Sequence, residues 1–314
     1  MIDVYNRYSD YLKKKYNVKV YKLPISLPVS CPNRELFGHG CSYCGKYGAG
    51  FENISSNISV SEQLKQNMEY IKLKYKASKF IAYFQNFTNT YMPLNDFNKY
   101  MNEAAEFENI IEIAVSTRPD CITNEYLDIL KEIKIKKNIN IVIELGLQSF
   151  NYHSLLYVNR GHTLAVYIDC VLKIKQYNFE ICTHIILNFP WDNMIDVVEN
   201  AKVLSALKTD YVIIHALYIE KDTQLADEYC KKQFEICSVD EYKERVITFL
   251  RFLSPHIVIQ RIISRAPKEN TLFSNWGESW WKIRDEIETK MNENCYKQGD
   301  LFDYLNGKAV KKFL

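Results

Sequence analysis

An α/β fold, a partial (β/α)6 barrel similar to a TIM barrel with a C-terminal α/β extension, is predicted by two kinds of segment that alternate along the chain. Short apolar runs predict strands, and longer segments with apolar residues three and four positions apart predict helices. The predicted strands are 21–29, 80–85, 111–116, 139–147, 181–189 and 211–217. The predicted helices between them are 60–75, 94–107, 124–134, 165–177 and 195–207. This repetition indicates parallel strands joined by right-handed crossovers, with helices over the outer face of the sheet.

A doubly wound open sheet is the alternative architecture, because periodicity alone does not distinguish a curved sheet from a flat one. In both architectures, ligands bind at the carboxyl ends of the strands. After about residue 220 the alternation weakens into helical segments at 224–234 and 239–253, a strand-like segment at 257–263 and a helical end at about 276–291. We therefore predict a barrel core over 1–220, which includes an N-terminal helix, and an extension over 221–314 packed on the core.

The composition is that of an ordinary folded protein. Of the 314 residues, 47% are hydrophobic and 25% are charged, and 40 Lys+Arg against 38 Asp+Glu give a formal net charge of +2. Nucleic-acid-binding proteins usually carry more positive charge, although the lysine runs at 13–15, 72–79 and 131–137 could form a local basic face. The N-terminus has no apolar signal-peptide core, and no apolar run reaches the roughly 18 residues of a membrane-spanning helix, so we expect a cytoplasmic location and no membrane partner.

Three of the nine cysteines share one loop. Cys31, Cys41 and Cys44 lie directly after the first predicted strand, in the sequence CPNRELFGHGCSYC, and Gly45 and Gly48 follow. Thiols of a cytoplasmic protein stay reduced, and clustered ones more often bind metal or react than form disulfides. Soft thiolates select zinc or iron–sulfur clusters. Three thiolates leave one iron of a 4Fe-4S cluster open, and a catalytic metal needs an open position.

A structural zinc site is the alternative for this loop, since the C-x2-C pair and His39 could supply tetrahedral ligands. No second C-x2-C or H-x3-H pair completes such a site. Small zinc modules also usually stabilise small domains, whereas this loop follows the first strand of a large α/β core. The pattern therefore favours an iron–sulfur cluster.

The cysteine loop and five further stretches resemble the radical S-adenosylmethionine superfamily. In order they are CPNRELFGHGCSYC (31–44), IAYFQNFTNTY (81–91), STRPDCI (116–122), ELGLQSF (144–150), NRGHT (159–163) and HIILNFP (184–190). The C-x9-C-x2-C spacing differs from the superfamily's commonest C-x3-C-x2-C, and the ordered set resembles the YhcC/YtqA-type subgroup, which is related to elongator-type and coproporphyrinogen dehydrogenase-type enzymes. The resemblance covers about residues 18–265. It implies a partial β/α barrel with the cofactor across its top.

The resemblance implies that Cys31, Cys41 and Cys44 are the catalytic and metal-binding residues. They would hold a 4Fe-4S cluster whose fourth position binds S-adenosyl-L-methionine. One electron would then cleave the sulfonium to methionine and a 5′-deoxyadenosyl radical, which removes hydrogen from the substrate. The electron would come from a partner such as flavodoxin or ferredoxin.

The resemblance also implies which residues bind S-adenosylmethionine. Glu144 corresponds to an acidic residue that contacts the ribose hydroxyls, and Arg160 corresponds to an arginine that binds the methionine carboxylate, which suits a planar guanidinium. The other implied contacts are Gln148 and Ser149 beside Glu144, Gln85, Asn86, Thr88 and Asn89 near the methionine amine, and Asn188 near the adenine. The alternatives are a salt-bridged barrel residue for Glu144 and a surface arginine for Arg160. His184 is equally well a core histidine or a site residue.

Members of the YtqA branch are associated with maturation of the wobble uridine of tRNA, on an aminomethyl-type side chain, so tRNA is the predicted substrate and partner. A basic mouth built from the lysine runs with Arg118, Arg261 and Arg265 would support this prediction. Radical modification of a small metabolite or peptide is a second hypothesis, because the shared core fixes the radical chemistry and not the target. A zinc-stabilised binding module without catalysis is a third.

Overall fold

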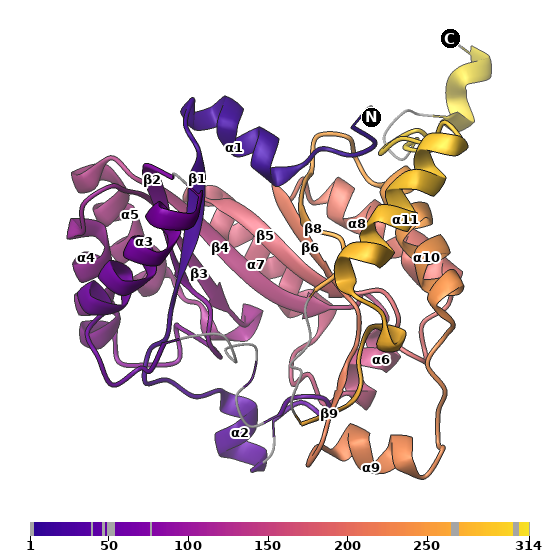
Figure 1. Ribbon diagram of the computed structural model, residues 1–314, viewed down its shortest axis with the longest axis horizontal. Helices are drawn as coiled ribbons and strands as arrows, with labels where there is room; N and C mark the ends of the chain where they lie inside the picture. Colours follow the sequence, from indigo (N-terminus) through magenta and orange to yellow (C-terminus); the bar gives the residue numbers. More distant parts are fainter. Residues whose placement is uncertain are drawn as a thin grey trace.

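The computed structural model describes residues 3–38, 40–45, 48, 54–75, 77–264, 270–303 and 308–313. Its centre is a seven-stranded sheet (Figure 1). The strands of this sheet, in spatial order, are β1 (Val20–Ile25), β2 (Lys79–Phe84), β3 (Ile110–Thr117), β4 (Asn140–Gln148), β5 (Glu180–Ile186), β6 (Tyr211–His215) and β8 (Val258–Arg261). Every neighbouring pair in it is parallel.

Helices connect successive strands. They are α1 (Tyr8–Tyr16), α2 (Pro32–Phe37), α3 (Val60–Tyr75), α4 (Leu94–Glu106), α5 (Asn124–Lys137), α6 (Tyr152–Tyr157), α7 (Leu164–Gln176), α8 (Met194–Ala206), α9 (Gln224–Cys230), α10 (Val239–Phe252) and α11 (Trp280–Glu293). Short 3-10 turns occur at Pro119–Cys121, Asn275–Gly277 and Lys308–Phe313. Within the described residues, no helix is both long and apolar enough to cross a membrane.

The sheet is a curled half-barrel, which confirms the predicted fold class. Its strands follow one another in chain order, whereas the order of a doubly wound sheet reverses at a switch point, so the alternative architecture is wrong. The sheet has one strand more than the six predicted for the core. The seventh, β8, comes from the 221–314 region, where a strand at 257–263 was predicted. The division at residue 220 remains a prediction.

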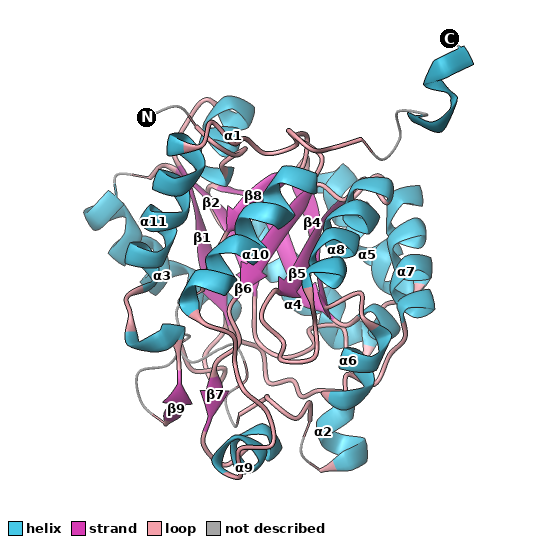
Figure 2. Cartoon of the chain, turned by 90° about the vertical axis from the view of Figure 1, so that its right-hand side faces the viewer, coloured by secondary structure: helices cyan, strands magenta, loops and turns pink. Residues whose placement is uncertain are grey.

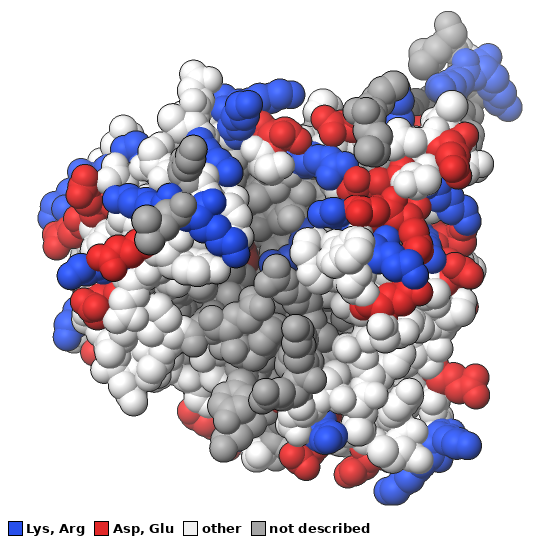
Figure 3. All heavy atoms as spheres, in the orientation of Figure 1, with Lys and Arg blue, Asp and Glu red and all other residues white. Residues whose placement is uncertain are grey.

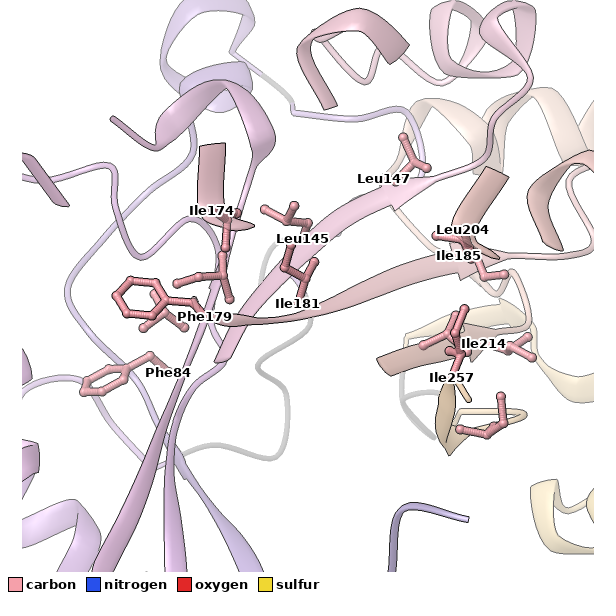
Figure 4. Close-up of a cluster of buried hydrophobic side chains, with 14 of the residues drawn as sticks. Phe84, Leu145, Leu147, Ile174, Phe179, Ile181, Ile185, Leu204, Ile214 and Ile257 are labelled. Carbon is pink, nitrogen blue, oxygen red and sulfur yellow. The ribbon is translucent and has the colours of Figure 1, made fainter. Parts of the chain in front are cut away.

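The main hydrophobic core lies between the outer face of the sheet and the helices. Alternate residues of each strand point to this face, such as Leu145 and Leu147 of β4 and Ile181 and Ile185 of β5. They pack against helix residues such as Leu204 of α8 (Figure 4). This packing accounts for the near-continuous apolar strands, because both faces of the half-barrel sheet are covered.

The other face of the sheet lines the interior of the half-barrel, and α1 covers one end of this interior. Leu12 of α1 is buried against the strand residues Val20, Val142, Tyr211 and Val258. Tyr8, Tyr11 and Tyr16 of the same helix pack around them. In Figure 1, α1 lies at the top of the molecule and α2 at the bottom, so α1 is at the end opposite the cysteine loop.

A two-stranded antiparallel ribbon extends from the sheet at the end where α2 lies. It consists of β7 (Ile219–Glu220) and β9 (Thr271–Phe273). Figure 2 shows this ribbon and α9 at the bottom of the molecule, on the same side as α2. The C-terminal region therefore contributes to the end of the barrel where the carboxyl ends of the strands lie.

Candidate functional site

The three clustered cysteines lie on a loop that the chain fixes at several points. Cys31 is the N-cap of α2, which begins with Pro32, a residue favoured at a first helical position. The amide of Cys44 donates to the carbonyl of Cys41 at 2.9 Å, which makes a tight turn. At Ser42, the amide donates to Val158 (3.0 Å) and the carbonyl accepts from Leu225 (2.9 Å). Both the core and the C-terminal region thus hold the loop.

Each of the three thiols faces a different arginine. The relevant pairs are Arg118 Nη1 to Cys31 Sγ at 3.8 Å, Arg160 Nη1 to Cys41 Sγ at 3.7 Å and Arg34 Nη2 to Cys44 Sγ at 3.3 Å. The Nδ2 of Asn33 also lies 3.5 Å from the Cys41 sulfur. Guanidinium groups stabilise thiolates, the form in which cysteine binds metal. The loop is therefore prepared for three negatively charged sulfurs.

Burial acts against this stabilisation at one of the three thiols. Removal from water raises the pKa of Cys44, the neighbouring Cys41 adds to the effect, and the hydrogen bond from Arg34 opposes it. An uncharged thiol is thus favoured at Cys44 while nothing is bound. A bound metal lowers the pKa of its thiol ligands outright, so binding would release a proton here.

Two positions near the sulfurs leave room for glycine and for no larger residue. Gly161 has a positive φ of 78°, and a Cβ there would collide with Asn33 Oδ1 and lie 2.9 Å from Arg118 Nη2. A Cβ on Gly45 would collide with the carboxylate of Glu220. Glycine is needed where the backbone comes this close to its neighbours.

Unpaired buried polar atoms indicate that the site is suited to a ligand. Among the described residues, those near the cysteine loop and the strand ends are Arg34 Nε, Ser42 Oγ, Asn86 Oδ1, Asn89 Oδ1, His162 Nε2 and Asn188 Nδ2. Buried polar groups in folded proteins are nearly always hydrogen-bonded, so such a group of orphans at one end of the barrel is unusual. Together with the three thiols, these donors and acceptors fit a cluster and a polar cofactor.

The sulfur positions do not match a preformed zinc site. In a tetrahedral site with Zn–S bonds of about 2.3 Å, sulfurs lie roughly 3.8 Å apart. Within the described part of the chain, the single group of three or more candidate ligands whose atoms all lie within 4.8 Å of one another is Glu144, Cys182 and His184. The three loop sulfurs are therefore more widely spaced. His39, the fourth zinc ligand considered above, lies outside the described residues.

The segment after β2 places several predicted residues beside the start of the cysteine loop. The amide of Gln85 donates to Ile25 at 3.3 Å, so this residue continues alongside β1. Asn89 is fully buried and its Nδ2 donates to the carbonyls of Phe84 (3.0 Å) and Ser116 (2.9 Å). The other predicted residues of this segment are Asn86, which is partly buried, and Thr88, which is almost fully buried. The two free Oδ1 atoms, on Asn86 and Asn89, are the segment's unused acceptors.

Glu144 lies inside the barrel, in a network of polar side chains. It is fully buried, its carboxylate pairs with Lys22 of β1, and its Oε2 lies 3.0 Å from His184 Nε2 and 3.4 Å from Ser116 Oγ. Burial alone would raise the pKa of this carboxyl, but the ammonium of Lys22 and the contact with His184 hold it well below its usual range. Glu144 is thus a carboxylate. Lys22 also donates to Gln260 of β8 at 2.7 Å, which bridges the two edges of the half-barrel.

A bulge in β4 brings two predicted residues together. Gln148 has a positive φ of 86°, and the pairing of β4 with β5 shifts between Gly146 and Gln148. The guanidinium of Arg160 donates to the carbonyl of Gly146, with Nε at 3.1 Å. A Cβ on Gly146 would lie 2.8 Å from Arg160 Nη2 and 3.2 Å from Gln148 Nε2. A non-glycine residue with positive φ stores strain, which is often found at functional sites.

Ser149, next to this bulge, is bonded within the protein. It is fully buried, its Oγ donates to Asp192 at 2.7 Å, and it accepts from the amide of Asn151 at 3.0 Å. Ser154 also donates to Asp192. Burial raises the pKa of Asp192 to about 6, although both serine hydrogen bonds oppose the shift.

Two further residues line the end of the barrel between these segments. The Oδ1 of Asn188, a fully buried residue, accepts from the amide of Leu217 at 2.7 Å, and its Nδ2 is free. Burial, with the nearby charge of Arg160, lowers the pKa of His162 to about 3, so this ring is neutral. The structure thus gathers all the predicted site residues at the strand carboxyl ends or in the interior just below them.

Several residues of the site were not predicted from the sequence. Asn33 and Arg34 lie inside the interval between the first two cysteines, and this position was the signal that could have indicated them. A lysine within the strand predicted over 21–29 could have indicated Lys22, and a histidine within the strand predicted over 211–217 could have indicated His215. Glu220 carries no comparable signal, because only the fold places it over Gly45.

Comparison with known proteins defines the class of this protein. The sequence profile of the Radical SAM superfamily matches residues 27–204, and that of the Radical_SAM C-terminal domain matches residues 209–293. The first match covers more than half of the chain. The chain therefore belongs to the Radical SAM superfamily.

Individual relatives agree with this assignment. Uncharacterized protein MJ0486 of Methanocaldococcus jannaschii is 31% identical over 95% of this chain and 92% of its own length. Uncharacterized protein YtqA of Bacillus subtilis is 28% identical over 98% of this chain and 95% of its own length. Elp3 of the archaeon Methanocaldococcus infernus has a similar fold, with a TM-score of 0.68 at 14% identity over 89% of this chain and 64% of that one.

Membership confirms the expected chemistry at the level of the family. The chain is a radical S-adenosylmethionine enzyme, and its cofactors are a 4Fe-4S cluster and S-adenosylmethionine. The zinc-stabilised binding module without catalysis is therefore wrong. The family does not fix the substrate, since one core serves many targets.

Proposed function

We propose that Cys31, Cys41 and Cys44 ligate the 4Fe-4S cluster and that the chain uses it for reductive cleavage of S-adenosylmethionine. The observation that carries this proposal is the contact of each thiol with its own guanidinium, at 3.3 to 3.8 Å. Several negative charges in one partly buried loop need nearby positive charges, because buried unpaired charges are costly. No other group of cysteines among the described residues has arginine partners of this kind.

We assign S-adenosylmethionine to the carboxyl ends of the strands, next to these sulfurs. We assign Arg160 to the methionine carboxylate, and the support is that its guanidinium lies beside Cys41 and donates to the Gly146 carbonyl. The other proposed contacts are Glu144 for the ribose hydroxyls, Gln148 and Ser149 beside it on the methionine side, Gln85, Asn86 and Thr88 for the methionine amine and Asn188 for the adenine. Unused polar atoms on Asn86 and Asn188 support their assignment.

The chain's own residues prepare this site for the cofactors. When bound, the cluster supplies the electron that cleaves the sulfonium. Arg34, Arg118 and Arg160 offset the charge of the sulfurs. Glu144 is held as a carboxylate, whose oxygens already accept hydrogen bonds from Lys22 and His184 and would accept one more from a ligand hydroxyl. The N-terminal helix packs Leu12 and three tyrosines over the far end of the barrel.

Iron analysis tests the ligand assignment. Protein purified without oxygen should contain about four irons per chain, and alanine at Cys31, Cys41 or Cys44 should remove most of the iron and abolish formation of 5′-deoxyadenosine with dithionite. Cys230→Ala is the matched control, since Cys230 is exposed and distant in sequence from the loop. Normal iron content in any of the three loop variants would refute the assignment.

For the substrate we propose the wobble uridine of tRNA, modified on its side chain at position 5. The support is the resemblance to the YtqA branch given above. Arg261 is exposed at the end of β8 and available to a phosphate, whereas Arg118 is buried and makes two hydrogen bonds to Asp120, at 2.9 and 2.8 Å. Arg265 lies outside the described residues.

Radical modification of a small metabolite or peptide is the second candidate, and the positions of the lysine runs favour it. Basic residues gather in the last turns of α1, α3 and α5. These helices precede parallel strands, so their last turns lie at the amino ends of the strands, opposite the cysteine loop. Figure 3 shows Lys and Arg atoms over α1 at the top of the view. The described lysines of these runs therefore lie away from the site, and Lys76 lies outside the described residues.

A label-transfer experiment separates the two candidates. Reconstituted enzyme is incubated with dithionite, S-adenosylmethionine and deuterated bulk tRNA, or with deuterated small-molecule extract of the same cells. Deuterium in 5′-deoxyadenosine from the tRNA alone would establish the RNA substrate, and deuterium from the extract alone would establish the small-molecule candidate. We further propose flavodoxin or ferredoxin as the reductant and the cytoplasm as the location, where the nine free cysteines would stay reduced.

A further inference from the structure

Four polar side chains inside the barrel form a continuous hydrogen-bonded chain. The Oε2 of Glu144 lies 3.0 Å from His184 Nε2, and the other ring nitrogen of His184, Nδ1, lies 3.0 Å from His215 Nε2. The remaining ring nitrogen of His215, Nδ1, lies 2.7 Å from Ser264 Oγ. The four residues come from β4, β5, β6 and the segment after β8. None of them is in the cysteine loop, and the two imidazoles contact each other directly.

The carboxylate fixes the direction of this chain. An ionised carboxylate only accepts hydrogen bonds, so Nε2 of His184 must carry the proton that it shares with Glu144. Burial holds the pKa of His215 well below its usual range, so this ring is neutral. With His184 also neutral, its Nδ1 accepts from His215 Nε2, and the Nδ1 of His215 accepts from the hydroxyl of Ser264. All donors point toward Glu144.

We propose that Ser264, His215, His184 and Glu144 form a proton relay between the substrate and the barrel interior. The Ser264 oxygen takes a proton from a bound group and passes its own proton to Nδ1 of His215. His215 in turn passes its Nε2 proton to Nδ1 of His184. One proton enters and none leaves, so His184 becomes an imidazolium beside the Glu144 carboxylate, and the reverse sequence returns the proton to product.

The surroundings of the two histidines suit temporary storage of one charge. Lys22 of β1 pairs with the same carboxylate and keeps it ionised, and Arg261 donates to Ser264 Oγ at 3.5 Å. Tyr83 of β2 and the buried thiol of Cys182 also face the network, and burial raises the pKa of both, so neither adds charge. The imidazolium of His184 would thus have one anion in contact, with Lys22 on its far side.

A cation site is the competing use of the same residues, because Glu144, Cys182 and His184 place ligand atoms within 4.8 Å of one another. The ammonium of Lys22 already occupies the carboxylate, and the Cys182 thiol is held in its protonated form by burial. Both features favour the relay. Metal binding at these residues is an outcome that the test below includes.

The relay limits the class of substrate. Removal of a hydrogen atom by a radical requires no protein base, so a relay is useful only where the reaction also moves a proton. Resting on the proposed function, the inference is that the substrate carries an ionisable O–H or N–H group near the reacting carbon. Ser264, at the end of the chain farthest from Glu144, is the residue that would touch this group.

Exchange of imidazole protons with water tests the relay without a substrate. In the reconstituted enzyme with histidine labelled by nitrogen-15, the Nε2 protons of His184 and His215 should be observed by NMR and exchange through the Ser264 hydroxyl. Ser264→Ala should slow this exchange by about tenfold, since it removes one hydrogen-bonded step of the path. Ser264→Thr, which keeps a hydroxyl, should restore it. Ser116→Ala, which touches Glu144 outside the chain, should have no effect.

Three results would overturn the relay. They are equal exchange in wild type and Ser264→Ala, a proton on Nδ1 of His215, and one bound zinc or cobalt ion that is lost in Cys182→Ser. If the Ser264→Ala variant does not fold, His215→Gln gives the same test. This substitution interrupts the hydrogen-bonded chain and should slow exchange of the His184 Nε2 proton with water equally. Absence of iron or of 5′-deoxyadenosine in wild type would contradict the proposed function and leave the exchange measurement interpretable.

Discussion

The arginines that contact the loop sulfurs are single residues whose substitution should change the reduction potential of a bound cluster. Arg34 is the one that bonds most closely, at 3.3 Å from Cys44 Sγ, and it also donates to the carbonyls of Cys44 and Gly45. Hydrogen bonds and positive charge near the sulfurs raise the reduction potential of an iron–sulfur cluster. The side chain therefore affects electron uptake as well as loop structure.

Arg34→Leu should lower the reduction potential of the cluster. A hydrogen bond to a charged group contributes roughly 1.5 kcal/mol, which corresponds to about 60 mV for one electron. A redox titration followed by electron paramagnetic resonance measures the change, and Arg34→Lys, which keeps the charge, should show a smaller one. An unchanged potential in Arg34→Leu with full iron content would show that this contact does not reach the cluster.

Asp192 should make stability depend on pH. Its folded-state pKa of about 6 lies above the ordinary value of 3.8, so its contribution to stability is fully present below about pH 4 and is lost as the pH rises through 6. The shift corresponds to a change on the order of 3 kcal/mol. Asp192→Asn should flatten the curve of unfolding free energy between pH 4 and 7 in urea titrations. The exposed Asp169 gives a control, since Asp169→Asn should leave the curve as it is.

At the scale of elements, the connection between α6 and α7 packs directly on the cysteine loop. Asn33 of α2 donates to the carbonyls of Asn159 and Arg160, at 2.6 and 3.2 Å, and Gly161 leaves room for it. The NRGHT motif thus supports the loop through its backbone as well as through Arg160. Its glycine is the residue on which this contact depends.

Gly161→Ala should destabilise the protein and loosen the cluster. The positive φ alone costs about 1–2 kcal/mol for alanine, and the new Cβ would push Asn33 away from Cys41. Gly277→Ala is the matched control, because Gly277 has a similar φ of 76° and no atom within 4 Å of a Cβ. Both variants should lose stability in urea, and only Gly161→Ala should lose iron on mild chelation. Equal iron loss in the two variants would mean that the Asn33 contact is unimportant.

The regular elements were largely predictable from the sequence, because each repeats one pattern over several turns or residues. The helix predicted over 60–75 matches α3 at both ends, and the strand predicted over 139–147 differs from β4 by one residue at each end. The strand predicted over 181–189 extends three residues beyond β5, since the apolar residues Leu187 and Phe189 are buried in a loop. The ribbon of β7 and β9 was not predicted, because strands of two and three residues have no measurable periodicity.

The whole molecule is an incomplete barrel whose two edge strands meet through side chains. Lys22 of β1 contacts both Glu144 and Gln260. The backbone carbonyl of Asn6, before α1, also accepts from the amide of Ile259 of β8 at 2.8 Å. Lys22 therefore contributes to closure of the half-barrel and to the charge balance of its interior. No sequence pattern indicates such a contact between residues 238 positions apart.

Lys22→Met should destabilise the protein by about 3–5 kcal/mol, the usual effect of leaving a buried carboxylate without its partner. The loss should be largest at neutral pH and smaller in acid, because the lowered pKa of Glu144 stabilises the native state only above its unfolded value. Urea unfolding at pH 7 and at pH 4 measures both effects. The double variant Lys22→Met with Glu144→Gln should recover much of the stability, and no recovery would indicate that Lys22 acts mainly on Gln260.

The sequence could indicate candidate ligand cysteines, and it could not indicate the residues that support them. Spacing and motif order gave Cys31, Cys41, Cys44, Glu144 and Arg160 as candidates because these lie in continuous stretches of sequence. Partners such as His215 for His184 depend on the register of neighbouring strands. Tertiary contacts of this kind have no local signature.

The attachment of the cysteine loop to distant residues also has a consequence for biosynthesis. The loop is translated early, yet its amide and carbonyl partners at Ser42 are Val158 and Leu225, which leave the ribosome more than a hundred residues later. A nascent chain of the first hundred residues would expose three thiols without the contacts that arrange them. Delivery of iron and sulfide by the cell's assembly machinery should therefore follow release of the full-length chain.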